Sequence, residues 1–180
     1  MASPNMKTFS KILFIIMLLL LVSVANIYAV SPKPTPIVIA VNSRDMRVKA
    51  LENVFESYNS PLTPHAAFYI ETADKYKVDW RLLPSIAGLE SSFGKRQMPN
   101  SHNSYGWGGG YIYFDSYEDG IETIISSLKK RYYDRGADTV YKIAPIYAES
   151  PTWAPRVTSF MNKIEAEYAR LKATTLTLTI

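Results

Sequence analysis

The chain has 180 residues, of which 47% are hydrophobic and 20% charged, a composition typical of one globular domain with short appendages. It has no cysteine, which excludes disulfides, thiol catalysis and cysteine metal sites, and two histidines at unrelated positions do not favour a zinc site or a Ser-His-Asp triad. The formal net charge of +4 gives no evidence for a nucleic-acid partner, and no cofactor is implied.

The first 30 residues have the three-part pattern of an export signal. Lys7 and Lys11 precede an apolar run that continues to Ala25, and Ile27 and Ala29 stand at the −3 and −1 places of a candidate cleavage site. Residues 1–30 are therefore either a cleaved signal peptide or an uncleaved membrane anchor, with residues 12–29 in the membrane. In both cases the lysines keep the N-terminus in the cytoplasm, so we expect an exported protein of the cell envelope or extracellular space.

The segment 31–43 contains alternating prolines and is expected to be an extended linker. A mainly α-helical domain is predicted over residues 44–172. Apolar residues at helical spacing predict helices over residues 47–58, over 63–76 with Thr63 and Pro64 at its start, and over 79–93 with Gly94 as its stop.

Residues 95–115 show no helical period. Four glycines interrupt aromatic residues there, and we expect either a small β-hairpin, in which "YIYF" pairs with "SYGW", or an irregular lobe. Ser116 and Asp119 then form a capping box that starts a helix ending before Gly136. Further helices are predicted over residues 140–147 and 152–171, and a loose tail over 173–180.

One carboxyl group stands out in the third predicted helix. At 100° per residue, Glu90 falls within the apolar stripe that contains Ile86, Leu83 and Phe93, whereas Ser85 and Gly88 face the other side. Burial and a position near the helix C-terminus both raise the pKa of a carboxyl group, which suits a general acid near neutral pH. The alternative is a structural glutamate paired with a cation.

Four segments in order resemble the glucosaminidase family of peptidoglycan hydrolases, in the lysozyme-like superfamily. They are "GLESSFGK", "NSYGWGG", "FDSYEDGIETI" and "YAESPTWAPRV", and the resemblance covers roughly residues 60 to 170. It implies a lysozyme-like fold in which Glu90 is the catalytic acid. It also implies that Asn103, Tyr105 and Gly106 match the Asn-x-Phe-Gly loop of the family. Tyr147 would then lie beside the acid and the sugar. Trp153 stands where the family usually has a tyrosine.

The resemblance therefore implies a monomeric enzyme that cleaves the β-1,4 glycosidic bonds of peptidoglycan glycan strands. Asp115 is the freest candidate for a second carboxylate, since Glu118 and Asp119 are better explained as charges of a capped first turn. The alternatives are that an acetamido group of the substrate assists or that no second acid is used. Residues expected to bind substrate, unless the aromatic ones simply pack the lobe, are Ser91, Asn103, Tyr105, Gly106, Trp107, Tyr111 and Trp153. The sequence leaves two alternatives open: a lytic transglycosylase that uses the same glutamate, and a non-catalytic wall-binding module.

Overall fold

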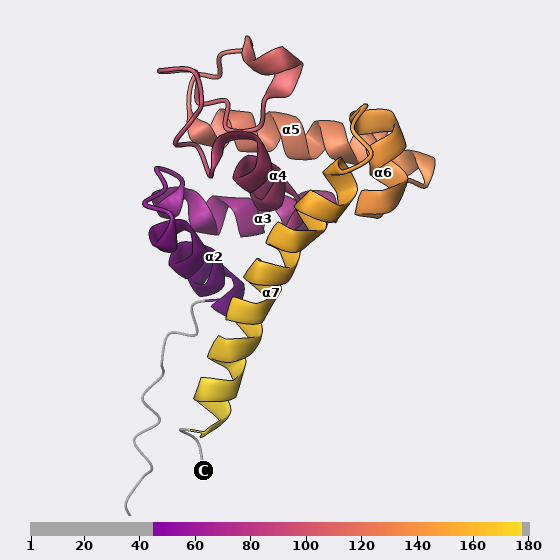
Figure 1. Ribbon diagram of the computed structural model, residues 1–180. Helices are drawn as coiled ribbons and strands as arrows, with labels where there is room; N and C mark the ends of the chain where they lie inside the picture. Colours follow the sequence, from indigo (N-terminus) through magenta and orange to yellow (C-terminus); the bar gives the residue numbers. More distant parts are fainter. Residues whose placement is uncertain (1–44, 178–180) are drawn as a thin grey trace, which may run out of the picture. The chain divides into compact units, whose positions relative to one another are not determined.

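The computed structural model describes residues 45–177, and these residues form a mainly α-helical domain, as predicted (Figure 1). The export segment and the whole proline-rich linker lie outside the described residues. Within residues 45–177, no helix is both long enough and apolar enough to span a membrane.

The α-helices follow the predicted order closely. They are α2 (Met46–Ser57), α3 (Ala66–Tyr76), α4 (Leu82–Ser91), α5 (Tyr117–Arg131), α6 (Val140–Tyr147) and α7 (Trp153–Thr177), with 3₁₀ turns at Thr63–His65, Trp107–Gly110 and Tyr133–Arg135. The predicted cap of α5 is present: the Ser116 hydroxyl accepts a hydrogen bond from the Asp119 backbone N–H at 3.1 Å. Elements between residues 45 and 135 therefore begin and end within a few residues of their predicted bounds.

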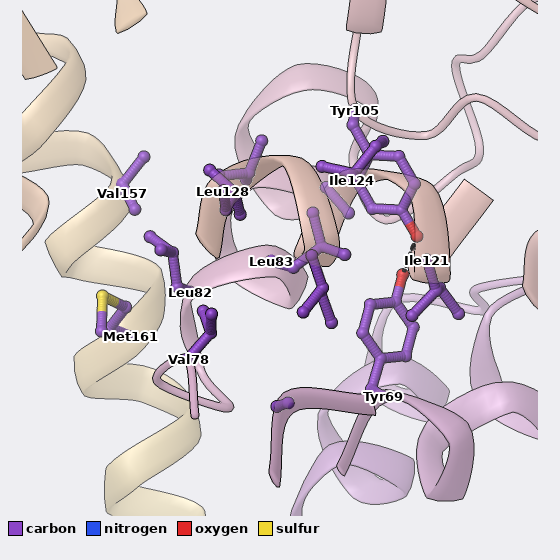
Figure 2. Close-up of a cluster of buried hydrophobic side chains, with 14 of the residues drawn as sticks. Tyr69, Val78, Leu82, Leu83, Tyr105, Ile121, Ile124, Leu128, Val157 and Met161 are labelled. Carbon is purple, nitrogen blue, oxygen red and sulfur yellow. Dashed lines mark hydrogen bonds between the residues drawn. The ribbon is translucent and has the colours of Figure 1, made fainter. Parts of the chain in front are cut away.

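Helix α4 lies in the middle of the domain, between α5 and α7 (Figure 1). Leu82 lies on the side of Val157 and Met161 of α7, while Leu83 lies toward Ile121 of α5 (Figure 2). Every residue from Leu82 to Gly88 is buried. The single apolar stripe expected for this helix is therefore wrong, because a helix packed on all sides has no solvent face.

The C-terminal end of α4 is a tight left-handed turn. Ser92, Phe93 and Gly94 have φ of 53°, 58° and 83°, so the helix stops at Ser91, two residues before the predicted end. A left-handed conformation is unfavourable for phenylalanine. Its ring is fully buried against the rings of Phe55, Tyr58 and Phe160, and this packing offsets the backbone strain.

The predicted β-hairpin is wrong, and the irregular alternative is what the structure has. No strand occurs in residues 45–177, and Gly106, Gly108 and Gly109 have φ of 63°, 62° and 72°, which are incompatible with an extended strand. The side chain of Asn103 holds this loop instead. It accepts from the Trp107 N–H at 3.0 Å and donates to the carbonyls of Trp107 and Ile112, each at 2.9 Å.

The expected loose tail is also wrong over residues 173–177, because α7 continues to Thr177. The hydroxyls of Thr174 and Thr175 donate to the carbonyls of Arg170 and Leu171, four residues earlier, at 3.0 and 3.1 Å. The alternation of threonine and leucine therefore does not form a strand here, since the threonines satisfy helical carbonyls.

Candidate active site

A cleft of about 500 Å³ opens where α4 ends. The loop 103–112 forms one wall, and the end of α5 and the connection between α6 and α7 form the others. Its lining residues are Glu90, Tyr105, Gly106, Trp107, Gly108, Gly109, Ile112, Arg131, Tyr132, Tyr147, Ala148 and Trp153. Glu90 thus shares one open cavity with the aromatic residues Trp107, Tyr132, Tyr147 and Trp153, in addition to Tyr105. The size of the cavity suits a small ligand or a few sugar rings.

Glu90 is placed at the point where α4 leaves the core. Its side chain is exposed to the cleft rather than buried in the helix stripe, which corrects the expectation from the helical wheel. Burial of the carboxyl group by the cleft walls nevertheless raises its pKa, and the Trp153 indole N–H and the charge of Arg156 oppose this rise only in part. The pKa of Glu90 is therefore raised in the expected direction, by partial burial in the cleft rather than within the helix stripe.

The backbone of Gly106 packs directly against the Glu90 carboxyl group. A Cβ atom at position 106 would lie 3.4 Å from Oε2 of Glu90 and 3.8 Å from its carboxyl carbon. Gly106 also has a φ of 63°, which favours glycine. Glycine at this position therefore lets the loop adopt its left-handed turn while it covers one side of the acid.

Tyr147 and Trp153 form the aromatic wall beside Glu90. Their ring centroids are 4.7 Å apart at an interplanar angle of 31°, and Tyr147 also lies 6.0 Å from Tyr132 and 6.4 Å from Trp107. Burial and the neighbouring charge of Glu90 raise the pKa of the Tyr147 hydroxyl. The structure thus brings Tyr147 and Glu90 together, as the sequence resemblance implied.

Trp153 belongs to the floor of the cleft. It is 4% exposed, and its indole N–H has no partner at hydrogen-bonding geometry within residues 45–177. The donor is nevertheless close enough to the Glu90 carboxyl group to lower its pKa. A buried, unpaired donor beside an acid is ready to bond the carboxylate once its proton has left.

Asp115 does not join the site. It is exposed on the loop before α5, it is not among the cleft-lining residues, and its N–H donates to Asp119 Oδ2 at 3.3 Å. Glu118 pairs with His65 and does not line the cleft either. Among the residues that the structure describes, Glu90 is the only carboxyl group that lines the cleft, so the predicted pair of catalytic carboxylates is not formed.

Three of the residues expected to bind substrate are structural. Ser91 is buried and donates to the Ser104 carbonyl at 2.6 Å, which ties the end of α4 to the loop. Asn103 is buried and bonded to the loop backbone. Tyr105 is 1% exposed, and its hydroxyl bonds that of Tyr69 at 2.6 Å inside the core (Figure 2), so its ring cannot stack on a sugar.

Tyr111 lies outside the cleft and is 79% exposed, whereas Trp107 and Gly106 line the cavity as predicted. Arg131 and Tyr132 also line it, and sequence reasoning missed both as site residues. In sequence, Lys129, Lys130 and Arg131 all suit the negative end of the α5 dipole, so nothing in this run separates Arg131 from its two neighbours. The sequence pattern that could have indicated Arg131 is its position three residues after the apolar Leu128, on the same side of the helix.

No protein-family model matches this chain, and no curated protein matches it either. What the fold and the site define is a helical domain with a partly buried glutamic acid that faces an open aromatic cleft.

Proposed function

We propose that this domain cleaves β-1,4 glycosidic bonds of peptidoglycan with Glu90 as the general acid. The observation that carries the proposal is the position of Glu90: a carboxyl group with a raised pKa that faces an open cleft lined by Trp107, Tyr132, Tyr147 and Trp153. A general acid must hold its proton near neutral pH and must reach the substrate, and this position serves both needs. The motif resemblance supplies the class of substrate.

In the proposed reaction, Glu90 donates its proton to the oxygen of the scissile glycosidic bond as the bond from that oxygen to the anomeric carbon breaks. The leaving sugar departs as an alcohol, and positive charge develops on the remaining sugar ring. In hydrolysis, the new Glu90 carboxylate then accepts a proton from the water molecule whose oxygen attacks the anomeric carbon. The Trp153 N–H can donate to this carboxylate during the interval in which it is charged.

A second candidate reaction, that of a lytic transglycosylase, is favoured by the number of carboxyl groups that line the cleft. A hydrolase of this type commonly uses two carboxylates, and Glu90 is the only one lining the cleft among the described residues. In a lytic transglycosylase, a hydroxyl of the same sugar attacks in place of water, so one glutamate can serve as acid and then as base. The product is an anhydro sugar.

Product analysis on purified peptidoglycan tests the proposal. Mass spectrometry that finds new reducing-end sugars indicates hydrolysis, anhydro ends indicate the transglycosylase, and no released product favours the non-catalytic wall-binding module. Glu90→Gln keeps the shape but cannot deliver a proton, so we expect activity to fall by about 10² to 10⁴. If Glu90→Gln keeps full activity and a normal melting curve, Glu90 is not the acid and the proposal fails.

The proposal includes export, because peptidoglycan lies outside the cytoplasm. It rests here on Lys7, Lys11 and the apolar run of the N-terminal segment. N-terminal sequencing of protein from the native envelope is expected to give either a start after Ala29 or the intact chain in the membrane fraction. Full-length protein confined to the soluble cytoplasm would contradict both forms of export.

A further inference from the structure

Arg131 is the only cationic side chain among the described residues that line the cleft. It is the last residue of α5, and its guanidinium group lies 5.7 Å from the centre of the Trp107 ring. Its neighbour Lys129 is engaged elsewhere, in an ion pair with Asp134 at 2.8 Å. Within residues 45–177, no carboxylate lies within ion-pair distance of Arg131.

Several other arginines of the domain are held by acids of the same chain. Arg47 pairs with Asp45 and Asp74, Arg81 pairs with Asp79 and Glu165, and Arg170 pairs with Glu167. Their charges are therefore satisfied internally. Arg131 has no such partner. Of the unpaired arginines among the described residues, Arg96, Arg131, Arg135 and Arg156, it is the one that lines the cavity with Glu90.

The cation–π contact with Trp107 holds the guanidinium near the ring without using its N–H donors. A cation over an aromatic face is held by the ring quadrupole, and an arginine retains five N–H donors at the edge of its plane. This edge is the group that recognises carboxylates, with two parallel hydrogen bonds where the geometry allows. The pair Arg131 and Trp107 therefore combines a sugar-sized aromatic surface with an anion-binding edge.

We propose that Arg131 forms a subsite for a carboxylate that the glycan substrate carries, and that this subsite selects wall glycan over neutral glycan. The inference rests on the proposed function of the cleft. Peptidoglycan can present such a carboxylate in two places: on the stem peptide, or on the lactyl group where the stem peptide has been removed. Neutral β-1,4 glycans such as chitin oligomers present neither.

Binding measurements in the Glu90→Gln background test the subsite without turnover. The ligands are three oligosaccharides of equal length: a fragment with stem peptides, the same glycan after an amidase has removed them, and a chitin oligomer. Titration calorimetry compares Arg131→Gln with Lys130→Gln as the matched control. Lys130 lies in the same helical turn and loses the same charge, but it is exposed and does not line the cleft.

We expect Arg131→Gln to weaken binding of a carboxylate-bearing glycan by about 10- to 100-fold, the usual effect of losing a hydrogen bond to a charged group. Binding of the chitin oligomer should not change, and Lys130→Gln should bind all ligands as the parent does. A loss confined to the fragment with stem peptides identifies the peptide carboxylate. A loss confined to the stripped glycan identifies the lactyl carboxylate. Arg131→Lys should recover part of the loss, since it restores the charge without the planar edge.

Two results would overturn the subsite: an equal loss for chitin and for the charged glycans, or no loss for any of them. Either result leaves the proposed function intact as long as the parent binds and the wild type cleaves wall glycan. If the folded parent binds none of the three ligands and the wild type cleaves none, the proposed function itself fails, and the subsite fails with it. Melting curves of all variants check that each chain is folded.

Discussion

The α-carbon of Gly106 faces the carboxyl group of Glu90, so closely that a Cβ at position 106 would lie 3.4 Å from Oε2. A Cβ at this distance would be in van der Waals contact with the carboxyl group. The loop 103–112 and the end of α4 therefore fit together around the acid. Both elements are fixed by buried hydrogen bonds, so a methyl group at position 106 would pack against the acid in a backbone conformation that strains any residue other than glycine.

Gly106→Ala is expected to lower activity by up to about tenfold, because the added methyl group occupies the cleft beside the Glu90 carboxyl group and the strained backbone can shift the loop relative to the acid. It should also cost about 1 kcal/mol of stability from the left-handed backbone. Gly136→Ala is the control: Gly136 has a similar positive φ of 84°, and a Cβ there meets nothing within 4 Å. Activity assays and melting curves should show the same stability loss in both variants, with an activity loss at position 106 alone. Equal activity in the two variants would show that contact with Glu90 does not matter.

The raised pKa of Glu90 predicts how its ionisation affects stability. In the unfolded chain the pKa of this carboxyl group is about 4.3. Because the fold favours the protonated form, the stabilising contribution is full below that pH and is lost as the pH rises through the raised pKa. Glu90→Gln does not titrate at this position. The melting temperature of the variant minus that of the wild type should therefore increase as the pH rises toward neutral. A wild type that gains on the variant over the same pH range would indicate a stabilised carboxylate, as in a structural ion pair.

Asn103 is expected to be essential for the loop but not for contact with substrate. Asn103→Ala leaves the Trp107 N–H and the carbonyls of Trp107 and Ile112 without the partners that they have now. The loss should be about 1–3 kcal/mol of unfolding free energy. Denaturant unfolding measures it, with the exposed Asn162→Ala as the control. A variant of normal stability that fails only to bind glycan would restore the substrate-binding role that the sequence suggested.

The hydroxyl pair of Tyr69 and Tyr105 is expected to behave as a buried unit. Tyr69→Phe or Tyr105→Phe leaves one buried hydroxyl without its partner at 2.6 Å, and each should destabilise the domain by about 1–2 kcal/mol. The double variant removes both groups, so its loss should be smaller than the sum of the two single losses. A double-mutant cycle by denaturant unfolding tests this. Strictly additive losses would mean that the two hydroxyls do not interact.

Glu167 is expected to support the packing of α2 on α7 in a pH-dependent way. Hydrogen bonds from Arg170, at 2.6 and 2.8 Å, and from Asn53 of α2 lower the pKa of Glu167 to about 2. Its contribution is therefore present above about pH 4.3, the usual value for glutamate, and is lost as the pH falls toward about 2. Glu167→Gln should be less stable than the wild type near neutral pH, and acid unfolding should show the difference disappear at low pH. A difference that persists unchanged in acid would exclude the charged form as its source.

The sequence by itself determined the helices and several of their ends. Spacing of apolar residues depends on the 3.6-residue period alone, so α2, α3 and α5 are readable without knowledge of their neighbours. The cap at Ser116 is readable for the same reason, because its hydrogen bond joins residues three apart. Glu90 was also found from local sequence, as the one acid in an otherwise apolar helix.

Only the tertiary structure decided what surrounds Glu90. The wheel placed this residue in a buried stripe, but α4 is enclosed on all sides, and exposure is set by where the helix leaves the core rather than by its angle. The loop 103–112 shows the same limit. Its glycines and aromatic residues fit a hairpin or an irregular lobe equally well in sequence, and three hydrogen bonds from Asn103, reaching up to nine residues along the chain, select the second.

The composition of the cleft is likewise a result of long-range packing. In the sequence, Asp115 and Arg131 are both charged residues near the ends of the same predicted helix, and nothing local favours either as a cleft residue. In the structure, Arg131 lines the cleft and Asp115 lies outside it. Which charge reaches the cavity depends on how α5 meets α4 and the segment around Tyr147, elements that are far apart in sequence. The spacing of residues within one helix does not predict how these elements pack together. Their packing is fixed by the burial of apolar side chains from several helices at once.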